Sequence, residues 1–188
     1  NRLEWLLDTT EPTEAQMEEL LKMQRTLRQI VRLNKTLLLL TKIDNGQFPE
    51  STEVDIAAIV GEQAALYDEI YASRDIVCTV NSAGPFVVRM NESLASTLVT
   101  NLLKNAYLHT AEGGTVTIDL RDRTLTVAND GAAPLDGEHI FERFYQGARK
   151  EGSTGLGLAL VSAVGRYYGL QVGYRFDGGR HCFSVRWP

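Results

Sequence analysis

The first part of the chain carries a seam of mostly apolar residues at alternating spacings of three and four. The seam consists of Leu20, Met23, Leu27, Ile30, Asn34, Leu37 and Thr41, and it is widened by Leu21, Val31 and Leu38. This spacing predicts a helix that packs against other helices in a bundle. Thr10 or Thr13 supplies a start signal, and Asn45-Gly46 supplies a stop. A helix of about 30 residues is about 45 Å long and cannot bury such a stripe by itself.

Residues 1–8 have the pattern of the last turns of a preceding helix, and residues 8–12 that of a bend. We therefore expect a helical hairpin whose first arm is nearly absent from this sequence. Two chains, each giving one hairpin, would complete a four-helix bundle. Asn34 on the seam either sets the register of that bundle or is a solvated edge residue.

From residue 54 onwards, helical and strand patterns alternate. We expect helices at 55–73, 91–110 and 155–168, and strands at 76–80, 86–89, 115–120, 124–128, 171–175 and 182–186. Residues 47–53 contain Pro49, Ser51 and Thr52 and are interpreted as a linker. The predicted fold class is α+β: a two-layer sandwich, with a mixed, mostly antiparallel sheet covered by about three helices, preceded by the long helix.

Composition narrows the classes of function. The chain has 188 residues, which suits one domain plus a small appendage. Its net charge of −5 gives no electrostatic footprint for nucleic acid, so we expect no nucleic-acid partner. Apolar runs such as residues 37–40 are far shorter than the roughly 20 residues that span a bilayer. Cys78 and Cys182 are isolated, which disfavours a zinc site or a disulfide framework.

One predicted helix carries a polar row at its margin. Asn101, Asn105 and His109 are four residues apart and lie on one side of the helix. Asparagine amides can ligate Mg²⁺ through Oδ1 without repelling a polyphosphate that already holds the ion. Taken alone, the row favours surface amides that have no role.

Three further segments carry candidate chemistry. Asn129, in a strand-end turn, offers an Oδ1 acceptor for the exocyclic amine of adenine, although Asn-Asp-Gly is also an ordinary turn. The glycines of residues 152–158 precede an apolar helix and would let phosphate approach its N-terminus. Arg143 belongs to an aromatic segment, residues 140–147, and with Arg149 and Lys150 it could reach phosphates from a mobile lid at residues 147–154.

The order and spacing of these segments resemble one family, the sensor histidine kinases. Residues 101–106 (Asn-Leu-Leu-Lys-Asn-Ala) resemble its N box, and residues 129–131 (Asn-Asp-Gly) fall at its G1 box. Residues 140–145 (Ile-Phe-Glu-Arg-Phe-Tyr) resemble the F box, and residues 154–161 (Thr-Gly-Leu-Gly-Leu-Ala-Leu-Val) the G2 box. The resemblance identifies residues 53–188 as an ATP-binding kinase domain. It identifies residues 1–48 as a partial dimerisation and phosphotransfer hairpin, mostly its second helix.

The resemblance implies roles for individual residues, with ATP and Mg²⁺ as cofactors. Asn105 would ligate Mg²⁺, and Arg143 would act near the γ-phosphate or at the interface with the hairpin. These two are the expected catalytic residues. The expected nucleotide-binding residues are Asn101, Asn105, His109, Asn129, Gly131, Tyr145, Thr154, Gly155, Leu156 and Gly157.

The G1 box departs from the family pattern. Asn129 replaces the usual acid, Asp130 follows one place late, and Ala133 replaces the second glycine. An amide keeps the acceptor and loses the charge, so the affinity for adenine is expected to fall by about 1–2 kcal/mol.

The resemblance implies transfer of the ATP γ-phosphoryl group to a histidine, for relay to an aspartate of a response-regulator receiver domain. The histidines of this sequence, His109, His139 and His181, all lie outside residues 1–48, so we expect the phosphoacceptor upstream of it. We expect His139 and His181 to be exposed. We also expect a homodimer through the hairpin and a cytoplasmic location in a membrane-associated full-length protein. The alternative is a weak nucleotide-binding scaffold that dimerises and regulates a partner without phosphotransfer.

Overall fold

The computed structural model describes residues 12–145 and 154–188, together with Trp5 and Thr9. The chain divides into two compact units, residues 1–39 and residues 40–188. The bend expected at residues 8–12 and the helix expected at residues 1–8 fall mostly outside the described residues.

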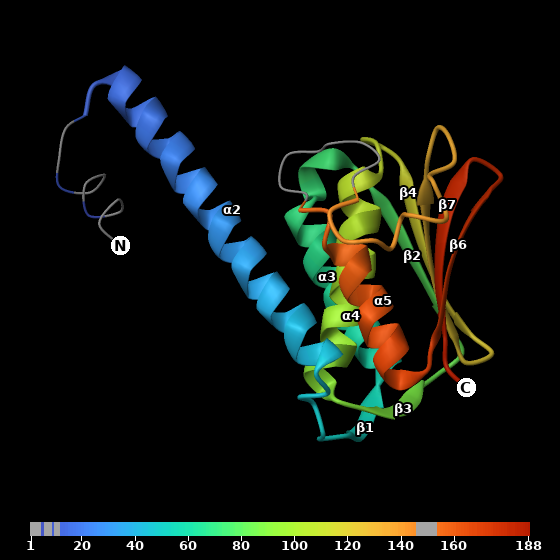
Figure 1. Ribbon diagram of the computed structural model, residues 1–188. Helices are drawn as coiled ribbons and strands as arrows, with labels where there is room; N and C mark the ends of the chain where they lie inside the picture. Colours follow the sequence, from blue (N-terminus) through green and yellow to red (C-terminus); the bar gives the residue numbers. More distant parts are fainter. Residues whose placement is uncertain (1–4, 6–8, 10–11, 146–153) are drawn as a thin grey trace. The chain divides into compact units, whose positions relative to one another are not determined.

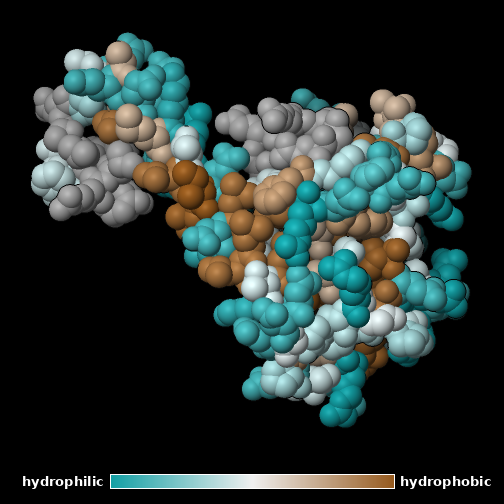
Figure 2. All heavy atoms as spheres, viewed as in Figure 1, coloured by the Kyte–Doolittle hydropathy of each residue, from teal (hydrophilic) through white to brown (hydrophobic). Residues whose placement is uncertain are grey.

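The first unit is dominated by one long helix, α2 (Glu14–Asp44). Its start is fixed by a capping box, because Thr13 N–H donates to Gln16 Oε1 at 2.9 Å and Thr13 Oγ1 accepts from Gln16 N at 3.4 Å. It ends at the predicted stop, where Gly46 takes the left-handed conformation at φ +69°. Figure 2 shows hydrophobic side chains at the surface of this helix. Met23, Leu27 and Ile30 of its seam are 47–55% exposed.

The second unit is a two-layer sandwich (Figure 1). One layer is a five-stranded sheet in the order β2-β4-β5-β7-β6. Its strands are β2 (Val77–Ser82), β4 (Thr115–Arg121), β5 (Thr124–Asp130), β6 (Gln171–Asp177) and β7 (Arg180–Arg186). Only β2 and β4 pair in parallel, and the other neighbours are antiparallel. The second layer consists of α3 (Ile56–Ile70), α4 (Glu92–His109) and α5 (Gly157–Tyr168), which cover one face of the sheet. The predicted α+β class is confirmed.

The core lies between the layers. The strands alternate, so that Leu125 and Val127 of β5 are fully buried while Thr124 and Thr126 are only half-buried. On the helical side, Leu94 and Leu98 of α4 are fully buried. Asn91 caps α4 by accepting from Leu94 N at 3.2 Å through Oδ1. The sandwich therefore holds α4 and β5, which carry two of the candidate segments, on opposite sides of one core.

A second, two-stranded sheet pairs β1 (Thr52–Asp55) with β3 (Val87–Met90). Strand β1 corrects the end of the predicted linker, because Thr52 and Glu53 belong to the strand, whereas residues 47–51 lie in no helix or strand. Its sequence, Thr-Glu-Val-Asp, has no apolar alternation, and Val54 is its one buried residue. Its strand conformation comes from pairing with β3, which lies far away in sequence.

The last five residues of α2, Leu40–Asp44, belong to the second unit. Leu40 and Ile43 are buried there. In the same unit, a short 3-10 turn, η1 (Ala72–Arg74), follows α3.

Among the described residues, no helix combines the length and apolar character that crossing a membrane requires.

Candidate nucleotide-binding site

The Asn129 side chain lies on the helix-covered face of β5, in line with Leu125 and Val127. It is 1% exposed, and its Nδ2 donates to the Asp130 carbonyl oxygen at 3.0 Å. Its Oδ1 is buried and has no hydrogen-bond partner within the described residues. A buried acceptor without a partner costs about 1–3 kcal/mol. The amide therefore offers a fixed acceptor to a donor that enters from outside the chain, such as the amine of adenine.

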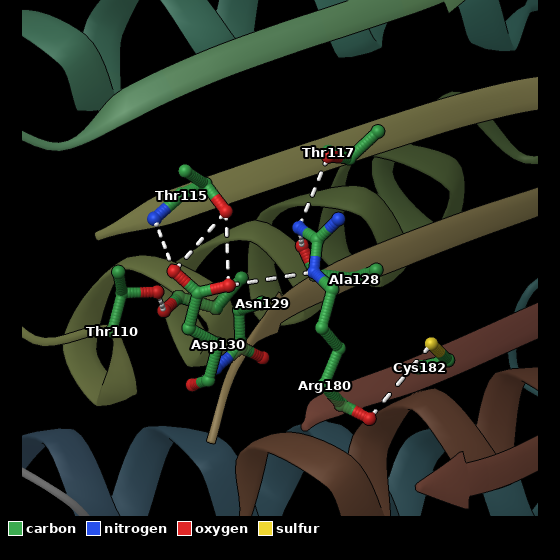
Figure 3. Close-up of polar contacts among 9 residues, drawn as sticks. Thr110, Thr115, Thr117, Ala128, Asn129, Asp130, Arg180 and Cys182 are labelled. Atoms are coloured by element: carbon green, nitrogen blue, oxygen red, sulfur yellow. Dashed lines mark hydrogen bonds and ion pairs between the residues drawn. The ribbon is translucent and has the colours of Figure 1, made fainter. Parts of the chain in front are cut away.

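Asp130 points to the other face of the sheet, because consecutive strand residues face opposite ways. Its carboxylate accepts from Thr115 N at 2.6 Å and from Thr115 Oγ1 at 2.9 Å, and lies 3.5 Å from Arg180 Nε (Figure 3). Arg180 also donates to Thr117 Oγ1 at 3.0 Å. The acid that stands one place late in the G1 box thus braces β4, β5 and β7 and does not share the face of Asn129.

Gly131 follows directly and is closely covered by His181. A Cβ on Gly131 would lie 2.1 Å from His181 Nε2, so any side chain there would displace the imidazole. His181 is 9% exposed, which corrects the expectation that it is exposed. It faces inward from β7 as the register partner of Asn129. Burial lowers the pKa of the imidazole. His139 is exposed, as expected.

The polar row of α4 meets the start of α5. Asn101 Nδ2 donates to the Thr97 carbonyl at 2.7 Å, and Asn101 Oδ1 would lie 3.0 Å from a Cβ placed on Gly157. The glycine therefore lets α5 begin directly against the N box. Asn105 is half-buried and its side chain has no hydrogen bond within the described residues. His109, the last residue of α4, is half-buried.

The segment before α5 is shaped by Gly155, whose φ is +66°. A Cβ there would lie 2.8 Å from the Phe144 carbonyl carbon and 2.8 Å from the Tyr145 carbonyl oxygen. The Gly155 oxygen accepts from Phe144 N at 2.8 Å. This contact joins the F box to the G2 box. Thr154 is half-buried, and residues 147–153 of the expected lid, with Arg149 and Lys150, lie outside the described residues.

Helix α5 begins without a side-chain cap. Leu156 is its N-cap residue and is fully buried, and it makes no side-chain cap hydrogen bond. The first N–H groups of a helix have no intrahelical partners, and the helix dipole favours an anion at this end. The start of α5 can therefore receive phosphate oxygens beside Asn101.

Arg143 of the F box contacts the end of α2. Its guanidinium donates to Asp44 Oδ2 at 2.5 Å, and Arg166 of α5 lies 3.6 Å from Asp44 Oδ1. Arg143 therefore lies at the end of α2, and its expected role near the γ-phosphate or at the interface with the hairpin stays a prediction. Phe144 is 58% exposed, whereas Ile140 is buried, so only part of the F box packs in the core.

The side chains available as ligands also bear on how Mg²⁺ could be held. Among the residues that the structure describes, no group of three His, Cys, Asp or Glu side chains could hold an ion. Asn105, with its unused amide oxygen, fits the expected arrangement in which one neutral ligand and the phosphates of a nucleotide share Mg²⁺.

A family model for histidine kinase-, DNA gyrase B- and HSP90-like ATPases matches residues 90–188. The chain belongs to this ATPase family. The matched residues contain all four boxes, so the resemblance stated from the sequence is confirmed. The matched residues also contain the α4, G1 and α5 segments of the candidate site described above.

Similar curated proteins are sensor kinases of bacteria. The chain is 35% identical over 171 residues to "Probable sensor histidine kinase TcrY" of Mycobacterium tuberculosis, covering 85% of this chain and 35% of TcrY. It is 33% identical over 158 residues to "Sensor histidine kinase RppB" of Synechocystis, covering 75% of this chain and 34% of RppB. The chain thus spans about a third of the length of these relatives.

Solved structures share the fold. Full-length ShkA in complex with AMPPNP matches with a TM-score of 0.78 at 24% identity, covering 97% of this chain and 41% of ShkA. The mycobacterial sensor histidine kinase MprB matches with a TM-score of 0.65 at 24% identity, covering 73% of this chain and 97% of the MprB structure.

Proposed function

We propose that residues 53–188 are the ATP-binding catalytic domain of a sensor histidine kinase, and that residues 1–48 are part of its dimerisation and phosphotransfer hairpin. The observation that carries this proposal is the buried, unpartnered Asn129 Oδ1 at the strand end where the family binds its base. The names of the similar proteins support the kinase over the scaffold alternative, since both TcrY and RppB are named as sensor histidine kinases.

In this proposal the chain positions ATP. Asn129 accepts from the adenine amine, Gly131 lines the purine, and the start of α5 receives phosphate oxygens. Asn105 would hold Mg²⁺ through Oδ1, and the ion supplies neutralisation of the phosphate charge. His109, Tyr145 and Thr154 border the nucleotide. Asn101 and Asn105 are half-buried, and as neutral amides they would add no negative charge beside the phosphates.

The reaction transfers the γ-phosphoryl group from ATP to a histidine nitrogen. The bond between the γ-phosphorus and the bridging oxygen breaks, ADP leaves, and a phosphorus–nitrogen bond forms. Such transfers depend on positioning and on charge neutralisation more than on covalent chemistry by the protein. Arg143 serves the transfer once it leaves Asp44, which lies at the end of α2.

The acceptor histidine is proposed to lie outside this sequence. Incubation of this chain with radiolabelled ATP and Mg²⁺ should therefore leave no acid-labile label on His109, His139 or His181. Label on any of them would contradict this part of the proposal. A receiver domain of a response regulator is the proposed next acceptor. We also propose a cytoplasmic location, where ATP is supplied, and membrane association for the full-length protein.

Dimerisation is proposed to use α2. Its seam residues Met23, Leu27 and Ile30 are exposed within the described residues, and exposed apolar stripes of this kind mark interaction surfaces. A second copy of the same helix would cover the stripe symmetrically.

Nucleotide binding tests the proposal directly. ATP titrated into the chain in the presence of Mg²⁺ should show saturable heat by calorimetry, and Asn105→Ala should weaken it by at least about tenfold. Asn81→Ala is the matched control, because Asn81 is an exposed amide on the edge strand β2 that bonds to Asp119. If wild-type protein binds no ATP at millimolar concentration, the proposed function is wrong.

A further inference from the structure

The turn between β6 and β7 closes over the end of β5. Gly131 N donates to the Gly179 oxygen at 2.9 Å, and the His181 imidazole lies against the Gly131 α-carbon. The G1 turn is therefore held by residues that come about 50 positions later in the chain. None of them belongs to the four boxes.

His181 is connected onward through Tyr174. The Tyr174 hydroxyl accepts from Leu135 N at 2.8 Å and lies 3.0 Å from His181 Nδ1. A phenol has one proton to donate. Because its oxygen accepts from Leu135 N–H, the phenol proton can be donated to His181 Nδ1. In that direction Nδ1 is unprotonated, and burial of the ring favours a neutral imidazole by lowering its pKa.

This link ties down both ends of the segment from Gly131 to Leu135. Gly131 is held by the imidazole and by Gly179, and Leu135 is held by Tyr174. The segment begins where the base would lie, beside the buried Oδ1 of Asn129. Since Asn129 and His181 are register partners on β5 and β7, a shift of the imidazole acts on the residue that would read the base and on the turn that would line it.

We propose that His181 is a positioning residue for the purine, and that together with Tyr174 it sets how well the site distinguishes adenine from other bases. The proposal rests on the proposed function, because it assumes that the nucleotide base binds at Asn129 and Gly131. His181 acts through Gly131 and Tyr174 and is not itself assigned a contact with the nucleotide.

The decisive readout is a ratio of affinities. ATP and ITP share the triphosphate and the sugar, but ITP has a carbonyl where ATP has the amine that Asn129 would accept. A variant that is partly unfolded loses apparent affinity for both nucleotides equally, so its ratio does not move. Competition against a fluorescent nucleotide gives both dissociation constants for each protein.

We expect wild-type protein to prefer ATP, and His181→Ala to reduce the ATP/ITP ratio about 5- to 10-fold. Tyr174→Phe, which deletes only the hydroxyl, should reduce it in the same direction. His181→Asn keeps an acceptor near the Nδ1 position and should restore part of the ratio. Asn81→Ala is the matched control: it removes an exposed amide on the edge strand β2, which β4 separates from β5, and should leave the ratio unchanged.

A double variant tests the contact itself. Gly131→Ala should reduce the ratio in the wild-type background, because the methyl group would lie 2.1 Å from His181 Nε2. In the His181→Ala background the same methyl group has room, so the second change should cost little further. Additive losses, or an unchanged ratio in folded His181→Ala protein, would overturn the proposal.

Amide hydrogen exchange in the nucleotide-free protein separates this proposal from the proposed function. Leu135 N–H should exchange faster in Tyr174→Phe, and Gly131 N–H faster in His181→Ala. If neither amide exchanges faster, His181 and Tyr174 do not hold the segment from Gly131 to Leu135, whatever the protein binds. If the variants exchange faster but the wild-type protein binds no ATP, the contacts of His181 and Tyr174 are confirmed. In that case the proposed function is wrong, and with it the role of these residues in base selection.

Discussion

Helices α2 and α4 carry apolar residues at the same three- and four-residue spacing, but they use them differently. In α4, Leu98 is 0% exposed, in the core between the two layers of the sandwich. In α2, Leu27 is 47% exposed and Ile30 is 55% exposed. The apolar period therefore shows which face of a helix will be covered, and it leaves open what covers it. In α4 the cover is the chain's own sheet, whereas Met23, Leu27 and Ile30 in the seam of α2 stay about half exposed within the described residues.

The largest expected effect is on the free energy of unfolding, which should depend strongly on the buried side chains of α4 and little on the seam of α2. Leu98→Ala should lower the free energy of unfolding of the second unit by about 2–5 kcal/mol, because it removes a fully buried side chain and leaves a cavity. Leu27→Ala should change it by less than about 0.5 kcal/mol, since Leu27 is half in solvent and lies in the other unit. Urea unfolding followed by circular dichroism measures both. Equal losses would mean that the seam of α2 is part of the same folding core.

The second prediction concerns association. If a second copy covers the seam of α2, Ile30→Asp should weaken the dimer by about tenfold or more, because a charge would be buried between apolar side chains. Sedimentation equilibrium over a range of concentrations measures the dissociation constant.

Gln29→Asp is the control for that experiment. It introduces the same charge one position away, on an exposed residue outside the seam. We expect the dimer to tolerate it. If both changes act alike, net charge rather than the seam governs association.

The sequence predicted best those elements whose causes are local. The helix expected at residues 91–110 is α4 (Glu92–His109), and the one expected at 155–168 is α5 (Gly157–Tyr168). The signals for these helices are all visible within a few residues of each boundary: the period of the apolar residues, Asn91 at the N-cap of α4 and the glycines at the ends of α5. The order of the four boxes was likewise readable, because each box is a contiguous segment.

Features that depend on distant partners were not readable. Strand β1 exists because β3 pairs with it, and its own four residues show no strand pattern. His181 follows two glycines and an arginine, which suggests an exposed turn, yet the register with Asn129 turns it into the core. The Arg143–Asp44 ion pair joins residues 99 positions apart. Burial and ion pairing of single polar residues come from topology, which local patterns do not encode.

The third prediction uses the one packed end of α2. Asp44→Asn removes the charge that holds Arg143, and should lower the free energy of unfolding of the second unit by up to about 1 kcal/mol, because the pair is half-exposed. The loss should shrink at 1 M salt, where the Debye length falls to about 3 Å. Arg166→Gln should cost less, since Arg166 lies at 3.6 Å and is more exposed. A loss that salt does not change would show that packing, not charge, holds this end of α2.

The smallest expected effects compare a buried histidine with an exposed one. Burial lowers the pKa of His181, so the folded protein prefers its neutral ring, and the stability tied to that preference is present above about pH 6.5 and lost as the pH falls below it. The hydrogen bond to Asp136 raises the pKa of His139, so its contribution is complete below about pH 6.5 and is lost as the pH rises through the raised value. Urea unfolding between pH 5.5 and 7.5 should therefore show the advantage of wild type over His139→Gln shrinking toward high pH. The advantage over His181→Asn should shrink toward low pH. Parallel trends for the two variants would contradict the opposite signs assigned to the two rings, and with them the difference between a histidine held by a neighbouring charge and one held by burial.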